Sequence, residues 1–154
     1  MFLYLVQHGI PKPKSEDPSQ SLSDIGKAEV EAVAKVVSSL NLKISKIFHS
    51  NKLRAIQTAE ILEKYLKPEE GREEAEGLKP LDDIKIWIEK IKELNKPIML
   101  VGHLPHLAKL SSFLITGDEE KPVINFRQGA IVCLEKKENN WIINWILHPD
   151  FCKI

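Results

Sequence analysis

Apolar residues recur along this chain in short continuous runs separated by stretches with helical spacing. Two such runs cover residues 2–6 and 97–101, and a third, strand-like run that is apolar at Ile44, Ile47 and Phe48 covers residues 44–49. A short segment that is apolar at nearly every position is typical of a strand buried on both faces, as in a parallel sheet covered by helices. The three runs therefore predict the central strands of a parallel sheet.

Two stretches in the first half of the chain have apolar residues every three or four positions, which predicts helices. Ser23, a good N-cap residue, begins the first helix. The second helix covers residues 53–66 and ends before Pro68. The positions expected to face the core from the first helix are Ile25, Ala28, Ala32, Val36 and Leu40.

Two further helices are predicted in the second half. Pro105 fits the first turn of the fourth helix, because a proline loses no hydrogen bond there, and Gly117 is a natural stop. Asp82 or Asp83 is placed to cap the third helix. The inner face of that helix is expected to carry Ile84, Trp87, Ile88, Ile91 and Leu94.

The remaining segments complete a fold class. Residues 130–135 and 141–147 are strand-like runs around a polar turn, which predicts a hairpin, and residues 10–21 and 68–77 are interpreted as loops. The order of elements predicts an α/β fold with three layers, helix-sheet-helix, around a mainly parallel sheet with an antiparallel edge strand. With no repeat or linker, one domain over residues 1–154 is expected.

The amino-acid composition limits the kinds of binding partner that can be expected. Lys+Arg and Asp+Glu both number 22, so no basic excess points to nucleic acid or an anionic membrane. No stretch is long enough to span a bilayer, and the first apolar run is too short for a signal peptide, so a cytoplasmic protein is expected. Cys133 and Cys152 provide no disulfide framework. The sequence leaves the oligomeric state open.

Residues suited to binding a phosphoryl group follow the three predicted strands. His8, Arg54 and His103 should converge, because the carboxyl ends of parallel strands share one edge of the sheet. A neutral His8 imidazole could attack phosphorus, and the planar fork of Arg54 matches phosphate oxygens. His103 precedes a helix N-terminus, where anions are favoured, and Ser50 adds donors beside Arg54. The pattern predicts a phosphatase or phosphoryl-transfer enzyme.

Each of these residues also has a structural interpretation. His8 could cap a strand end, Arg54 could pair with a surface acid, and His103 could stabilise a turn. A metal site is not expected, because there is no His-x-x-x-His pair and no cysteine cluster, and glycine-rich nucleotide loops are absent, so no cofactor is predicted. His106 is expected to be a surface or packing residue, while His49 and His148 receive no role.

Three segments together resemble the histidine phosphatase (phosphoglycerate-mutase-like) superfamily, and most of all its small SixA-type phosphohistidine phosphatases. They are His8-Gly9, residues 50–59 with the sequence Ser-Asn-Lys-Leu-Arg-Ala-Ile-Gln-Thr-Ala, and residues 101–105 with the sequence Val-Gly-His-Leu-Pro. The resemblance covers nearly the whole chain. It implies that His8 is the phosphorylated nucleophile and that Arg54 and His103 lie in the phosphate pocket.

The chain departs from the family pattern at Gln7, where arginine is usual. An amide donor is kept but a charge is lost, and a hydrogen bond to a charged group contributes roughly 1.5–3 kcal/mol. Asp82 and Asp83 stand near the place where larger relatives carry a general acid, although both could be helix caps. Only the short segment 68–80 is available as a lid, so a shallow pocket is expected.

These observations favour a phosphatase that works through phospho-His8 on protein phosphohistidine. Its leaving group, imidazole, has a conjugate-acid pKa of about 6.5 and needs little help from an acid. Two alternatives stay open. The substrate could be a small phosphate ester, or the chain could be a non-catalytic phosphate or phosphoprotein binder whose Gln7 marks lost turnover.

Overall fold

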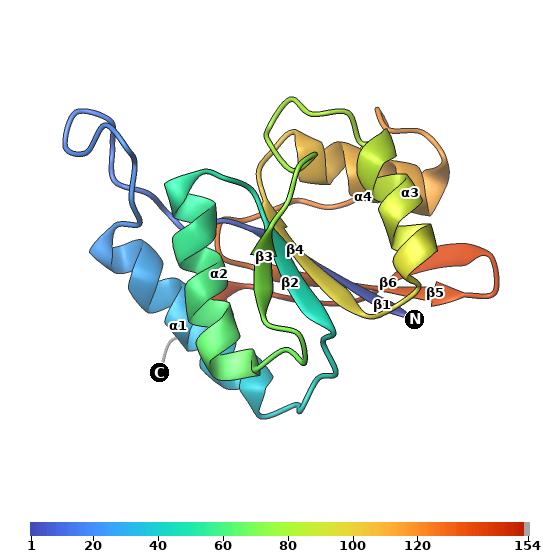
Figure 1. Cartoon of the computed structure of the whole chain (residues 1–154), viewed down its shortest axis with the longest axis horizontal. Coiled ribbons are helices and arrows are strands. Elements are labelled where there is room, and N and C mark those ends of the chain that lie inside the picture. Colours follow the sequence, from blue (N-terminus) through green and yellow to red (C-terminus); the bar gives the residue numbers. More distant parts are fainter. Residues whose placement is uncertain (153–154) are drawn as a thin grey trace.

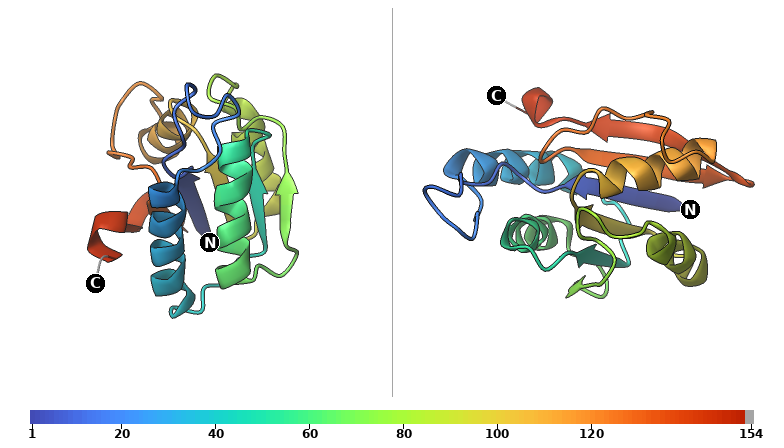
Figure 2. Two further views of the ribbon diagram at one scale, coloured as in Figure 1. Left: turned by 90° about the vertical axis from the view of Figure 1, so that its left-hand side faces the viewer. Right: turned by 90° about the horizontal axis from the view of Figure 1, so that it is seen from above.

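The structure is a computed structural model that describes residues 1–152. One six-stranded sheet with the strand order β3-β2-β4-β1-β5-β6 lies between two layers of helices (Figures 1 and 2). The predicted three-layer α/β fold is confirmed. The strands are β1 (Phe2–Gln7), β2 (Lys46–His49), β3 (Arg72–Glu74), β4 (Ile98–Gly102), β5 (Ile131–Lys137) and β6 (Asn140–Leu147). The helices are α1 (Asp24–Ser38), α2 (Leu53–Leu66), α3 (Lys85–Leu94), α4 (His106–Thr116) and the 3-10 helix η1 (Pro149–Cys152).

Sheet topology places the first strand at the centre. β1 pairs in parallel with β4, which pairs in parallel with β2, and β2 pairs in parallel with β3. On its other side β1 pairs antiparallel with β5, which forms the predicted hairpin with the edge strand β6. β1 and β4 end level with each other, because Gln7 lies opposite Gly102.

The alternation of side chains along β1 divides the core into two. Tyr4 and Val6 are buried on the face covered by α1 and α2, while Leu3 and Leu5 are buried on the face covered by α3 and α4. The largest fully buried side chain of the second core, Trp87, belongs to α3 and donates its indole N–H to the carbonyl of Glu76. Both faces of the central strands are therefore dry, as their continuous apolar sequences predict.

The predicted core face of α1 is wrong. Ile25, Val36 and Leu40 are 67%, 43% and 55% exposed, and the helix ends at Ser38, before Leu40. The face of α1 that packs on the sheet begins at Gly26. A search for apolar side chains does not find this position, because glycine has no side chain. A Cβ on Gly26 would lie 2.2 Å from the carbonyl oxygen of Ile10, so only glycine allows this approach. The buried residues of α1 are Gly26, Val30, Val33, Ala34 and Val37.

Two smaller expectations are also wrong. Residues 68–77, interpreted as a loop, contain the strand β3, whose side chains are charged because it is a short edge strand with little buried surface. Leu94, expected on the inner face of α3, is partly exposed at the last turn, where Asn95 adopts a left-handed conformation and ends the helix.

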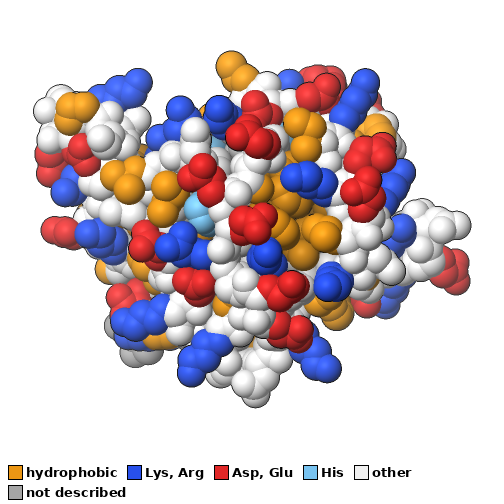
Figure 3. Space-filling view, viewed as in Figure 1, with side chains coloured by type: hydrophobic (Ala, Val, Ile, Leu, Met, Phe, Trp, Pro, Cys, Tyr) orange, Lys and Arg blue, Asp and Glu red, His pale blue; other side chains and the backbone are white. Residues whose placement is uncertain are grey.

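Surface charge is mixed. On the face shown in Figure 3, positive and negative side chains are interspersed, and neither sign dominates a large area. Within residues 1–152, no helix is both long enough and apolar enough to cross a membrane. Affinity for an anion must therefore come from a local arrangement of groups.

Candidate active site

The two strands at the middle of the sheet carry His8 and His103 to the same edge. Each histidine directly follows its strand, and the backbone N–H of His8 donates to the carbonyl of Gly102 over 3.1 Å. The two rings lie 5.0 Å apart between centroids at an interplanar angle of 51°, and both are buried. The structure thus brings the two histidines together, although 94 residues of chain lie between them.

The orientation of His8 fixes its tautomer. Its Nδ1–H donates to the carbonyl oxygen of Gly9 at 2.7 Å, and because a carbonyl can only accept, the proton of the neutral ring belongs on Nδ1. Nε2 then keeps its lone pair. Burial lowers the pKa of His8 below its usual 6.5, so the ring is neutral at pH 7. A neutral imidazole with a free Nε2 is a competent nucleophile.

The backbone after β1 is held by α2. The N–H of Gly9 donates to Oγ1 of Thr58 over 3.0 Å, and the hydroxyl of Thr58 donates to the carbonyl of Arg54 over 2.8 Å. A Cβ on Gly9 would lie 2.8 Å from the side chain of Val30, so glycine is needed for this close approach. Thr58 therefore ties the His8 turn to the turn of Arg54, a link that the sequence analysis missed.

Arg54 is a half-buried cation without an anionic partner in the described part of the chain. It stands in the first turn of α2, where the helix dipole disfavours positive charge. Burial lowers the pKa of its guanidinium. Its charge adds to burial in lowering the pKa of His8 and of His103. A bound anion would supply the counter-charge that Arg54 lacks.

Ser50 and His103 complete the group of polar side chains at this edge of the sheet. Oγ of Ser50 and Nε2 of His103 are hydrogen-bonded at 2.6 Å, and both side chains are buried. The N–H of Lys52 also donates to Oγ of Ser50, at 3.3 Å. Burial, followed by the nearby His8, lowers the pKa of His103 to about 3. His103 is therefore a neutral hydrogen-bonding group at pH 7.

The remaining sequence-predicted residues lie around this cluster. Gln7 is the last residue of β1, and its half-buried amide makes no hydrogen bond within residues 1–152. Asp82 accepts the N–H of Lys79 and Asp83 accepts the N–H of Lys85, each at 2.9 Å. Both carboxylates thus stabilise the turn before α3. Neither aspartate occupies the N-cap position of α3, which is Ile84. Asp83 precedes it by one residue and accepts the N–H of Lys85, the first residue of the helix.

The other histidines have separate surroundings. His49 is buried, with Nδ1–H donating to the carbonyl of Ser50 at 2.9 Å and Nε2 accepting from Arg72 at 3.2 Å. His106 opens α4, follows the cis Leu104–Pro105 bond and is buried. Burial lowers the pKa of His106 against the opposing influence of nearby carboxylates. Of the two expectations for His106, packing is the one that the structure bears out.

The cluster combines a neutral nucleophile and neutral hydrogen-bonding groups at the sheet edge with a cation, Arg54, whose charge acts on both histidines. Such a set suits a tetrahedral oxyanion such as a phosphoryl group, because each donor can meet a different oxygen. In the part of the chain that the structure describes, no three His, Cys, Asp or Glu side chains are grouped as metal ligands.

Sequence comparison decides the family. The profile of the histidine phosphatase superfamily (branch 1) matches residues 3–85, more than half of the chain. An uncharacterized protein of Picosynechococcus sp. is 30% identical over 146 residues, which cover 84% of this chain and 87% of that protein. The chain belongs to the histidine phosphatase superfamily. The matched region includes His8, Ser50 and Arg54, and the fold adds His103 from beyond it.

Solved structures share the fold along nearly the whole chain. The structure of the protein histidine phosphatase SixA complexed with tungstate superposes with a TM-score of 0.85 at 23% identity, covering 99% of this chain and 100% of that one. The α-ribazole phosphatase from Shigella flexneri superposes with a TM-score of 0.76 at 13% identity, covering 97% of each chain. The superfamily fold is therefore present without a large insertion.

Proposed function

We propose that this protein is a phosphatase that transfers a phosphoryl group to Nε2 of His8 and then to water. In the first step Nε2 forms a bond to phosphorus while the bond to the leaving group breaks. In the second step water attacks the phosphohistidine, His8 regains its lone pair and inorganic phosphate leaves. The observation that carries the proposal is the neutral, oriented His8 beside the unpaired cation of Arg54.

The neighbouring groups have complementary roles in this proposal. Arg54 neutralises the phosphoryl oxygens, and Gln7 offers an amide from the end of β1. Ser50 and His103 share one hydrogen bond, so with Nε2–H of His103 donating to Oγ the Ser50 hydroxyl is free to donate to a phosphoryl oxygen. Donors that are already in place when charge builds up in the transition state lower the barrier without reorganisation. The bond between Ser50 and His103 and the link through Thr58 hold these groups ready.

Protein phosphohistidine is the substrate class we infer. Asp83 is exposed, Asp82 is half-buried, and both accept backbone N–H groups, so neither serves as a dedicated acid for an alkoxide leaving group. An imidazole leaving group, with a conjugate-acid pKa of about 6.5, needs far less protonation than an alkoxide. Similarity to SixA, a protein histidine phosphatase, supports the same choice. A small phosphate ester is the alternative substrate within this chemistry.

The rate of hydrolysis should depend on the leaving group. A phosphohistidine peptide and p-nitrophenyl phosphate should be hydrolysed at least about a hundredfold faster than 3-phosphoglycerate. Only the alkoxide leaving group of 3-phosphoglycerate needs a general acid, whose contribution is about 10²–10⁴-fold. The double substitution Asp82→Asn and Asp83→Asn should hardly change kcat/KM for p-nitrophenyl phosphate or for a phosphohistidine peptide that contains no lysine or arginine. Phosphate release measured with all three substrates checks this.

The opposite result is equally clear. Rapid hydrolysis of 3-phosphoglycerate that is lost in the double Asp82 and Asp83 variant would reveal a working general acid. It would make the protein a small-molecule phosphatase and contradict the phosphohistidine assignment. Melting temperatures of both proteins serve as the control, because the two aspartates also stabilise the turn before α3.

The second prediction concerns Gln7. Gln7→Arg should tighten vanadate binding about tenfold or more, because it restores a charge-assisted contact of roughly 1.5–3 kcal/mol. Isothermal titration calorimetry with vanadate measures the change. If the protein were a binder without turnover, the parent would show no phosphate release and the substitution would create it. An unchanged vanadate affinity would mean that Gln7 does not reach the bound anion.

A further inference from the structure

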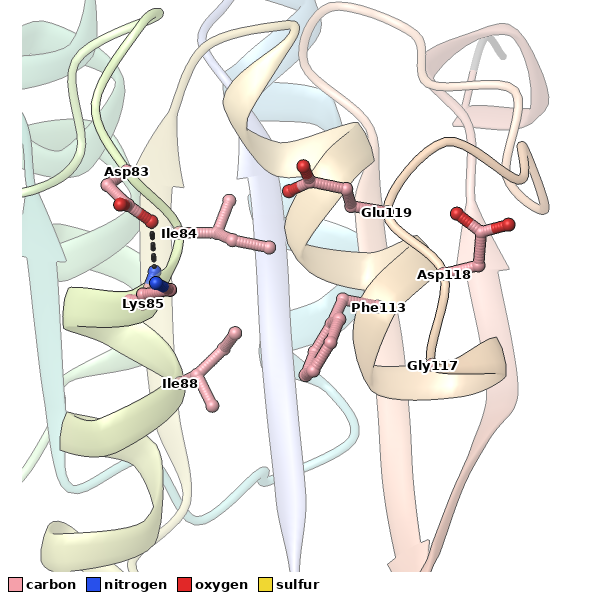
Figure 4. Close-up of a pocket in the computed structure, with 8 residues that line it drawn as sticks. All are labelled: Asp83, Ile84, Lys85, Ile88, Phe113, Gly117, Asp118 and Glu119. Atoms are coloured by element: carbon pink, nitrogen blue, oxygen red, sulfur yellow. Dashed lines mark hydrogen bonds between the residues drawn. The ribbon is translucent and has the colours of Figure 1, made fainter.

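A cleft of about 530 Å³ lies between α3 and α4 and has no role in the proposed chemistry. Figure 4 shows its two walls, with Ile84 and Ile88 pointing from one side toward Phe113 on the other. Phe113 is 38% exposed, so an aromatic face remains available to a ligand. The lining residues are Asp83, Ile84, Lys85, Ile88, Phe113, Gly117, Asp118 and Glu119.

Carboxylates surround this apolar floor. Asp83 and Glu119 stand on opposite sides of the gap in Figure 4, and Asp118, also a lining residue, stands farther to the right. One oxygen of Asp83 accepts the N–H of Lys85, and one oxygen of Asp118 accepts the N–H of Glu120. Within residues 1–152 none of the three acids forms an ion pair. With one cation, Lys85, among the lining residues, the three carboxylates give the rim a negative balance.

The end of α4 adds to this negative potential. The helix terminates at Gly117, a lining residue, so the last carbonyl groups of α4 and the negative end of its dipole lie at the cleft. An apolar floor below a negative rim matches the side chain of lysine or arginine, whose aliphatic stem packs on apolar surface while its cation stays at the polar edge. A free phosphate ester would be repelled there.

The cleft lies along α4, the helix that begins three residues after His103 of the candidate active site. Its upper end is formed by Asp83, and the charges of Asp82 and Asp83 are felt by His106, the first residue of α4. His106 is three residues after His103. Leu104, between the two histidines, is an exposed apolar side chain. A polypeptide whose phosphorylated residue enters the site can therefore run from there over the cleft.

We propose that the cleft is a subsite for a lysine or arginine side chain of the phosphorylated protein substrate. The stem of that side chain packs between Ile88 and Phe113, and its cation lies between the carboxylates of Asp83 and Glu119. This inference rests on the proposed function, because it names a feature of the protein substrate of that same site. It assigns part of substrate recognition to residues outside the phosphate pocket.

The test uses peptides that each carry one phosphohistidine. One series places a single lysine at successive positions on either side of the phosphohistidine, and a matched series has glutamine in its place. For the best position, kcat/KM of the parent protein should be about tenfold higher with lysine than with glutamine, mainly through KM. The double substitution Asp118→Asn and Glu119→Gln should remove most of this preference, as should Phe113→Ala. Turnover of p-nitrophenyl phosphate should stay unchanged in these variants.

Two results would overturn the subsite. One is the absence of a lysine preference at every position, and the other is a preference that persists unchanged in both variants. Charge reversal by Glu119→Lys gives an independent check, because it should turn the preference toward a peptide with glutamate at the same position.

Failure of the proposed function would be recognised separately. If no phosphohistidine peptide is hydrolysed, the substrate assignment fails. The subsite is then tested by measuring whether a lysine-containing peptide binds to the cleft. The unphosphorylated lysine and glutamine peptides are then titrated into the full-length protein while amide NMR signals are followed. Shifts at Phe113 and Glu119 that require lysine support the subsite, and equal or absent shifts overturn it.

Discussion

Replacing His8 by alanine is expected to abolish turnover of phosphohistidine peptides and of p-nitrophenyl phosphate while the protein stays folded. The substitution removes the Nε2 lone pair that forms the bond to phosphorus. The structural loss is limited to one hydrogen bond to Gly9 and the ring contact with His103. Rapid acid-free quenching with radiolabelled substrate should detect a phosphorylated protein in the parent and none in His8→Ala.

A matched histidine provides the control. His148 lies near the end of the chain beside Asp150, and His148→Ala should keep both turnover and labelling. Circular dichroism and a melting curve verify that His8→Ala is folded. Turnover or acid-labile labelling that survives in a folded His8→Ala protein would reject the covalent mechanism, whatever the substrate.

Arg54→Ala is expected to lower kcat/KM by about 10²–10³-fold, the range found when a group that stabilises an oxyanion is removed. The effect on stability should have the opposite sign. The parent holds a half-buried cation at a helix N-terminus without a partner among the described residues, so its removal should leave the melting temperature unchanged or raise it. His103→Ala should lower kcat/KM within the same range.

Ligand binding separates the two effects. Vanadate at a hundred times its dissociation constant should stabilise the parent by about 2.7 kcal/mol, and Arg54→Ala should lose most of this gain at the same concentration. Arg72→Ala is the matched control, because that guanidinium is paired with Glu60 and Glu63 and should contribute to stability rather than turnover. Full activity in Arg54→Ala would remove this residue from the site.

The fold and the placement of the main site residues were predictable because they depend on short-range patterns. The continuous apolar runs located β1 and β4, and the turn residues directly after them could only lie at one edge of a parallel sheet. The boundaries of α2 were predicted to the residue, since Pro68 ends the pattern and the apolar spacing inside it is regular. Each of these inferences needs only neighbouring residues.

The errors arise where distant segments decide the outcome. The packing face of α1 depends on Gly26 meeting the backbone of Ile10, and the role of Thr58 depends on Gly9, 49 positions away. The strand β3 forms because β2 offers an edge, although its own residues are charged. Pattern reasoning assigns a residue by its own side chain, and these three positions are defined by a partner that the pattern does not contain.

The central position of β1 has a consequence for folding kinetics. Its partners β4 and β5 come from the second half of the chain, with Leu3 opposite Ile98, so β1 leaves the ribosome long before either neighbour has been made. Pairings between distant segments form late, because closing the long intervening loop costs entropy before the contacts repay it. During refolding, phosphatase activity should therefore return only when β1 has paired with β4. This recovery should be slower than the return of the circular dichroism signal of the helices, which form from local segments.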